Sequence, residues 1–97
     1  MKTFEEIRHT LTGLKNELSR KYKVKEIGIF GSWVSGGHNA KSDIDILVEF
    51  SEPVGFFAFL DLEEYLGKLL GVKVDLVTKN ALKPTIGKYI LKEMMPV

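Results

Sequence analysis

The chain has 97 residues without cysteine, and 14 basic against 13 acidic residues give a formal net charge of +1 at pH 7. A hydrophobic share of 44% is that of a folded protein and argues against disorder. The absence of cysteine excludes disulfides, zinc–thiolate sites and thiol catalysis, and the near-neutral charge argues against a broad nucleic-acid surface. No apolar run is long enough to cross a bilayer. We therefore expect a single cytoplasmic domain over residues 1–97, with no membrane partner and no direct nucleic-acid partner.

The first half of the chain predicts one helix and two strands. Apolar residues at helical spacing predict a helix over residues 3–21, and Thr3 followed by Glu6 is a capping-box pattern at its start. Two short apolar runs, at residues 26–30 and 44–50, predict strands. Small and polar residues fill the segment between them, so we expect a loop there.

The second half predicts a helix, a strand and a further helix. Residues 56–70 carry an amphipathic pattern that Gly71 ends, and residues 72–77 read VKVDLV, a third strand. A last helix over residues 82–93 and a short strand within residues 94–97 complete the chain. The order α-β-β-α-β-α favours an α/β (α+β) fold, with one sheet covered by helices.

Three aspartates are the candidate metal ligands. Asp43 and Asp45 stand two residues apart at the start of a strand, so both point to one face with Cα atoms roughly 6.6 Å apart. Two carboxylates placed so close repel each other unless one is protonated or a cation lies beside them. Asp75 is a charge inside an otherwise largely apolar strand, which is costly unless it is paired or metal-bound. If the two strands are neighbours, three hard oxygen ligands suited to Mg²⁺ meet.

Glycine and serine dominate the segment before the Asp43/Asp45 pair. Gly31, Ser32 and Gly36 allow backbone N–H groups and a hydroxyl to approach phosphate oxygens. A plain turn closed by aspartate is the alternative, and it is the better interpretation of the tetrapeptide SDID taken alone. The full string is a strand, Gly-Ser, a loop, Ser-Asp-x-Asp, a strand and a later strand aspartate. This string favours a phosphate site.

The segments GIFGS, SDIDILVEF and KVDLVT together resemble the minimal nucleotidyltransferases of the DNA polymerase beta superfamily, over nearly the whole chain. The resemblance implies a mixed sheet and transfer of a nucleoside monophosphate from ATP or another NTP, with two Mg²⁺ ions. It implies that Asp43, Asp45 and Asp75 are the catalytic and metal-binding residues, and that Asp75 helps to deprotonate the acceptor hydroxyl. The nucleotide would be held by Gly31, Ser32, Gly36, Lys41 and Ser42.

Stand-alone domains of this family resemble antitoxins that add AMP to a tyrosine of a HEPN-type toxin, so the resemblance implies such a toxin as partner, in a possible oligomer with it. Family members often carry an arginine where this chain has Ser35, and Lys41 is the cation that could replace it. The alternative is therefore a weak or inactive binding module that neutralises its partner by occlusion. Transfer to a small molecule is a third hypothesis, which the short chain disfavours.

Two lysines, a tryptophan and a group of phenylalanines each allow a functional and a purely structural interpretation. Lys73 and Lys79 flank the Asp75 strand and could attract a nucleotide, although exposed lysines are common. Trp33 could stack on a base, but packing is the usual role of a tryptophan beside a strand end. The phenylalanines of the second helix cannot all face one core; one could be a partner contact, or neighbouring elements could cover all of them. They are Phe56, Phe57 and Phe59.

Overall fold

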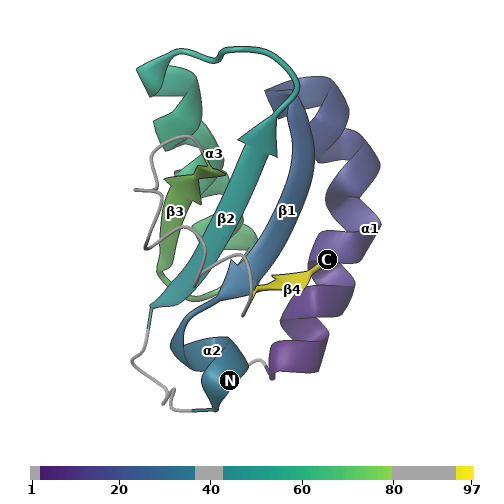
Figure 1. Ribbon diagram of the computed structural model, residues 1–97, viewed down its shortest axis with the longest axis vertical. Coiled ribbons are helices and arrows are strands. Elements are labelled where there is room, and N and C mark those ends of the chain that lie inside the picture. The colour runs from purple at the N-terminus through teal and green to yellow at the C-terminus, as the bar shows by residue number, and fades with distance from the viewer. Residues whose placement is uncertain (1–2, 37–42, 80–93) are drawn as a thin grey trace.

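The computed structural model describes residues 3–36, 43–79 and 94–97 (Figure 1). Four strands form one mixed sheet in the order β3-β2-β1-β4, in which β1 runs antiparallel to β2 and β4 while β2 and β3 run parallel. The α/β fold with a mixed sheet is thus confirmed. The elements in chain order are α1 (Phe4–Tyr22), β1 (Val24–Phe30), α2 (Ser32–Ser35), β2 (Ile44–Phe50), α3 (Phe56–Leu70), β3 (Val74–Thr78) and β4 (Met95–Pro96).

Local signals in the sequence fix both ends of α1. The Thr3 hydroxyl accepts a hydrogen bond from the Glu6 backbone N–H at 3.2 Å, so half of the predicted capping box is present. Glu5 and Glu6 lie in the first turn, where they complement the helix dipole. Lys23 adopts a left-handed conformation with φ 62° and ends the helix before β1 begins.

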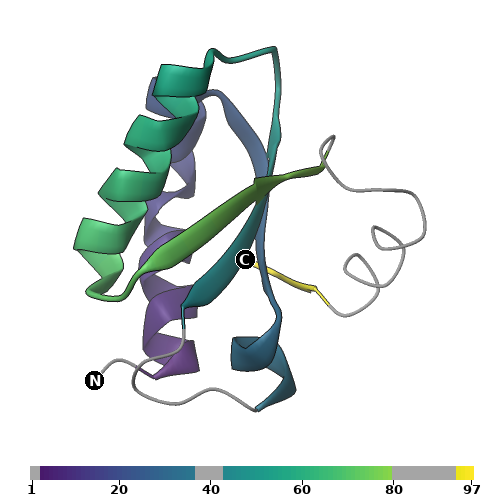
Figure 2. The ribbon, with the colours of Figure 1, turned by 90° about the vertical axis from the view of Figure 1, so that its left-hand side faces the viewer.

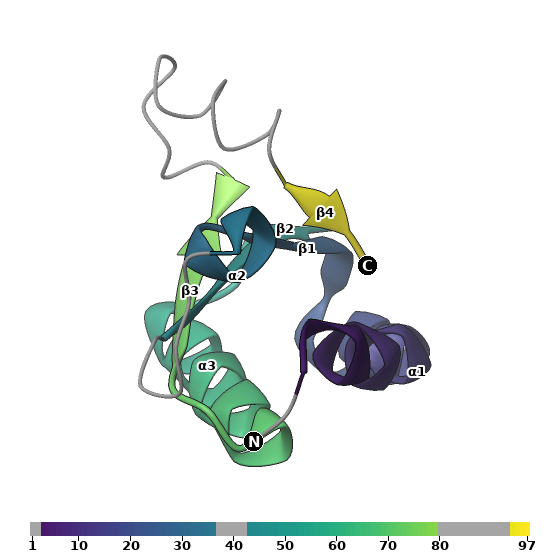
Figure 3. The same cartoon turned by 90° about the horizontal axis from the view of Figure 1, so that it is seen from below.

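Both long helices cover the same face of the sheet (Figures 2 and 3). They bury their apolar stripes against alternate residues of β2, because side chains two apart on a strand share a face. Seen from below, α1 and α3 lie side by side under the sheet (Figure 3), and they contact each other as well as β1 and β3. The fully buried side chains of this core include Ile7, Leu11, Leu18, Ile29, Ile44, Ile46, Val48, Leu62, Leu66 and Leu70.

The strand directions bring three strand ends together. Because β1 is antiparallel to β2, the last residues of β1 lie beside the first residues of β2, and Phe30 pairs with Asp45. Because β2 and β3 are parallel, their first residues also lie at this end, and Asp45 pairs with Asp75. We call it the acidic end of the sheet. The helix α3 provides the crossover that a parallel pair requires.

Four expectations need correction or lie outside the described residues. The segment after Gly31 was expected to be a loop, but it begins with the four-residue helix α2. β1 begins two residues earlier than expected, and β3 runs over Val74–Thr78 rather than residues 72–77. The predicted helix at residues 82–93 lies outside the described part. The predicted strand near the C-terminus is β4. Among the described helices, none is both long and apolar enough to span a membrane.

Candidate functional site

Gly31 directly follows β1, and its backbone lies against the carboxylate of Asp45. Its backbone has φ 77° and ψ −152°, a region open essentially to glycine alone. A Cβ atom at this position would collide with Oδ2 of Asp45. Glycine is therefore required twice here, once by the backbone conformation and once by the space that the carboxylate occupies.

Asp45 and Asp75 face each other across β2 and β3. They are register partners in the parallel pair, and their side chains share a hydrogen bond. Burial raises the pKa of the half-buried Asp45 carboxyl, and the negative charges of Asp75 and Asp43 raise it further. Two ionised carboxylates this close repel each other, and a cation beside them would relieve this repulsion.

Asp43 lies at the margin of this pair. It is exposed, one residue before β2, and it acts on Asp45 through its charge. Within residues 3–36, 43–79 and 94–97, no three acidic or histidine side chains are arranged to hold a metal ion among them. The structure thus brings two of the three expected acids into contact and leaves the third beside them.

The other predicted nucleotide ligands fall into two groups. Ser32 begins α2 directly after Gly31, at the acidic end, and Gly36 ends α2 with φ 87° and an N–H that donates to the Ser32 carbonyl at 3.0 Å. Lys41 and Ser42 lie outside the described residues. Trp33 is 3% exposed and belongs to the core, so its packing role is confirmed.

The donor set of the acidic end suits a magnesium ion. Mg²⁺ is normally held by one or two carboxylates, with water and substrate phosphate completing its shell. Asp45 and Asp75 supply such a pair, and no lysine or arginine of the described part forms an ion pair with either of them. A divalent cation would supply the positive charge that these carboxylates lack. The residues present therefore fit the ion that the sequence predicts.

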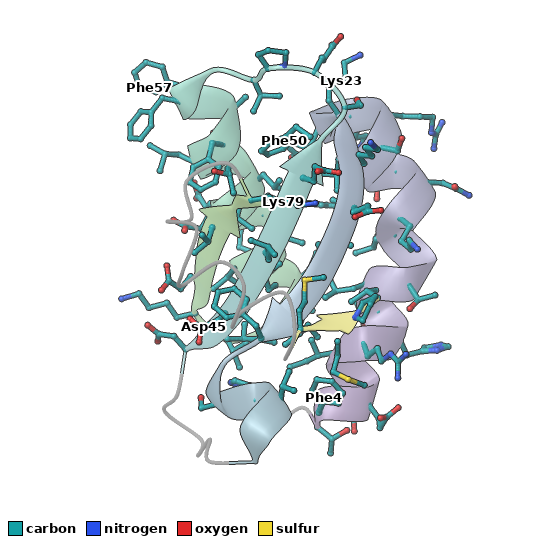
Figure 4. All side chains as sticks on the ribbon, in the orientation of Figure 1. Phe4, Lys23, Asp45, Phe50, Phe57 and Lys79 are labelled. Carbon is teal, nitrogen blue, oxygen red and sulfur yellow. The ribbon has the colours of Figure 1, made fainter. Side chains whose placement is uncertain are left out.

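A hollow formed by other described residues lies elsewhere. It measures about 730 Å³ and opens between the far ends of β2 and β3 and the first turn of α3, where Phe50, Pro53 and Phe59 line it. Figure 4 shows Asp45 at one end of the sheet and Phe50 and Phe57 toward the other. Neither the three aspartates nor Gly31 lines this hollow. The candidate site at the acidic end is thus separate from this hollow.

Comparison with known proteins agrees with this geometry. Residues 11–96 match the family model described as a nucleotidyltransferase domain. A protein of Thermococcus cleftensis named protein adenylyltransferase MntA is 50% identical over 97 residues, which cover all of this chain and 98% of the relative. The chain belongs to the nucleotidyltransferase domain family.

Solved structures with the same fold include a minimal nucleotidyltransferase and toxin–antitoxin proteins. A minimal nucleotidyltransferase superposes with a TM-score of 0.86 at 29% identity, covering 99% of this chain and 97% of the other. A toxin–antitoxin structure with AMP-PNP superposes with a TM-score of 0.73 at 24% identity, covering 91% of this chain and 69% of the other. A complex of a tri-AMPylated Shewanella oneidensis HEPN toxin with an MNT antitoxin superposes with a TM-score of 0.66 at 22% identity. The superposition covers 93% of this chain and 70% of the other. The resemblance to minimal nucleotidyltransferases is confirmed.

Sequence reasoning missed two features of the acidic end. The contact of Gly31 with Asp45 could not be anticipated, because it depends on the register between β1 and β2. The helix α2 was also missed, since four residues are too few to show a helical period. The glycines at 31 and 36, which bracket α2, were the available signal for a short turn of helix.

Proposed function

We propose that the chain transfers AMP from ATP to a hydroxyl group of a HEPN-type toxin, a tyrosine in the simplest case, and so acts as its antitoxin in the cytoplasm. The observation that carries this proposal is the Asp45–Asp75 pair beside Gly31, in a chain that belongs to the nucleotidyltransferase family. Support for AMP and for a toxin partner comes from the name of the Thermococcus cleftensis relative and from the AMPylated HEPN toxin found with an MNT antitoxin.

Each residue of the acidic end has a task in this reaction. Gly31, Ser32 and Gly36 would bind the triphosphate through backbone N–H groups and a hydroxyl. Asp43, Asp45 and Asp75 would hold Mg²⁺, and two such ions would neutralise phosphate charge in an in-line displacement. The acceptor oxygen attacks the α-phosphorus, the bond to the bridging oxygen of the β-phosphate breaks, and pyrophosphate leaves. Asp75, exposed on the edge strand, would take the hydroxyl proton.

The test is the mass of a candidate HEPN partner. Incubation of this partner with the chain, ATP and Mg²⁺ should increase its mass by one or more AMP groups, and EDTA should prevent the increase. Asp45→Asn should abolish it, because half of the central carboxylate pair is gone. The control variant is Asp61→Asn, an exposed aspartate of α3, which should leave transfer intact.

Occlusion without catalysis is the competing function, motivated by Ser35 at the position where family members often carry an arginine. It predicts that the chain binds and neutralises the partner while the partner keeps its unmodified mass. If Asp45→Asn still protects cells fully from the toxin, transfer is not the mechanism of neutralisation.

A further inference from the structure

Lys73 lies on the acidic end, on the same face as Asp75. Its backbone carbonyl accepts a hydrogen bond from the Ile44 N–H at 2.9 Å, which ties it to the first residue of β2, next to Asp43. Lys73 and Asp75 are exposed while Val74 and Leu76 are buried, so alternation along the strand places both charged side chains on one face. Lys73 thus adds an ammonium group to the end of the sheet that carries the three carboxylates.

Within residues 3–36, 43–79 and 94–97, this ammonium group forms no ion pair with a carboxylate. Lys21, Lys23, Lys25, Lys68 and Lys79 each form an ion pair with a glutamate within the described part of the chain. Lys73 forms none there, although three aspartates lie on the same end of the sheet. As far as the described residues go, the exposed Lys73 is therefore available to a group from outside the chain.

The strand order decides which substrate Lys73 can meet. Gly31 and Ser32 follow β1, whereas Lys73 precedes β3, and β2 with Asp45 lies between the two strands. With strands about 4.8 Å apart, Lys73 is about two strand spacings from the glycines that would bind the triphosphate. Lys73 stands next to Asp75, the residue that would take the proton of the acceptor. It lies on the acceptor side of the site.

We propose that Lys73 is a specificity-determining residue that binds an acidic side chain of the acceptor protein. Lys73 and Asp75 are two residues apart, which is roughly 6.6 Å along a strand. An acceptor segment in extended form would therefore carry its acidic residue about two positions from the hydroxyl that receives AMP. This inference rests on the proposed function, because it names the partner chemistry of the same site.

Steady-state transfer kinetics with the HEPN partner test this assignment. Lys73→Met should raise the KM for the partner about fivefold, as expected for the loss of an exposed ion pair. The KM for ATP should stay within about twofold of the wild-type value, and Lys73→Arg should restore the partner KM. Lys15→Met is the matched control, since Lys15 is another exposed lysine without an ion pair in the described residues, and it should change neither value.

A charge swap makes the test stricter. Lys73→Glu should lose partner transfer, and replacing the acidic residue about two positions from the modified hydroxyl by lysine should recover it. A rise in the KM for ATP with an unchanged partner KM would overturn the assignment in favour of a nucleotide contact. Unchanged values for both would make Lys73 a bystander. Absence of transfer by the wild-type chain itself would overturn the proposed function, and this inference with it.

Discussion

Among the acidic residues that the structure describes, Asp45 is the one whose surroundings raise the pKa of its carboxyl. Burial and two neighbouring carboxylates raise its pKa, so the folded chain binds this proton more tightly than the unfolded chain. Stability therefore falls as pH rises from the ordinary carboxyl range through the raised pKa of Asp45, and the loss is complete above it. A cation bound at the acidic end would remove this loss.

Asp45→Asn should consequently raise the melting temperature at pH 7 in EDTA, although it destroys the site. The gain should vanish at a pH below the ordinary carboxyl pKa, where the wild-type side chain is neutral in both states. Mg²⁺ with AMP-PNP should stabilise the wild-type chain and leave the variant unchanged, because ligand binding to the folded state alone raises its stability. Thermal denaturation measures both effects. A lower melting temperature for the variant in EDTA would contradict this account of Asp45.

Gly31, directly after β1, packs its backbone against the carboxylate of Asp45. Gly31→Ala should destabilise the chain by about 1 to 3 kcal/mol for its backbone conformation and should also displace Asp45, so nucleotide binding is lost. Gly71 offers a matched control at the end of α3, because its φ of 70° is similar and a Cβ there would meet no atom within 4 Å.

Gly71→Ala should therefore cost about 1 to 2 kcal/mol of stability and keep the affinity for AMP-PNP. Urea unfolding and calorimetric titration with Mg²⁺ and AMP-PNP separate the two effects. Equal nucleotide affinity in the two glycine variants would show that the space beside Asp45 has no functional role.

At the scale of elements, α3 shows how far a periodic pattern determines burial. Leu62, Leu66 and Leu70 recur every four residues and are fully buried. Phe56 and Phe57 remain 68% and 81% exposed, with their rings in an edge-to-face contact, while Phe59 packs against the core. The expectation that not all three phenylalanines face one core is confirmed.

Leu66→Ala should lower the free energy of unfolding by about 2 to 5 kcal/mol, because it leaves a cavity between α3 and the sheet. Phe57→Ser should change it by less than about 0.5 kcal/mol, since the ring is largely in water already. Urea denaturation of both variants measures the difference. A large loss for Phe57→Ser would show that its ring contributes to the fold.

The long elements could be predicted because each carries its own signal, and the short ones could not be placed so well. The capped start of α1 and the bounds of β2 follow from Thr3, Glu6 and the run Ile44–Phe50. α2 lacks the length to show a period. The two-residue β4 exists only through its pairing with β1, where Met95 lies opposite Ile29. Such elements depend on tertiary partners, which a local pattern does not contain.

At the scale of the molecule, the site depends on strand order and register. The sequence identifies Asp43, Asp45 and Asp75 as candidates by residue type and by their places on strands. It does not state that β2 and β3 are neighbours with Asp45 opposite Asp75, since this follows from how α3 packs on the sheet. Lys73 and Gly31 lie on opposite sides of β2, and this placement also follows from the strand order. The strand order and register therefore bring the candidate aspartates together at one end of the sheet.

Transfer of label from ATP to the HEPN partner tests the central claim most directly. With radioactive phosphorus at the α position, the wild-type chain and Mg²⁺ should label the partner, and label at the γ position should remain in pyrophosphate. Asp75→Asn should slow α-label transfer by about a hundredfold or more, the usual contribution of a general base. Labelling from the γ position, or equal α-labelling by the wild-type chain and Asp75→Asn, would contradict a nucleotidyl transfer site at the acidic end.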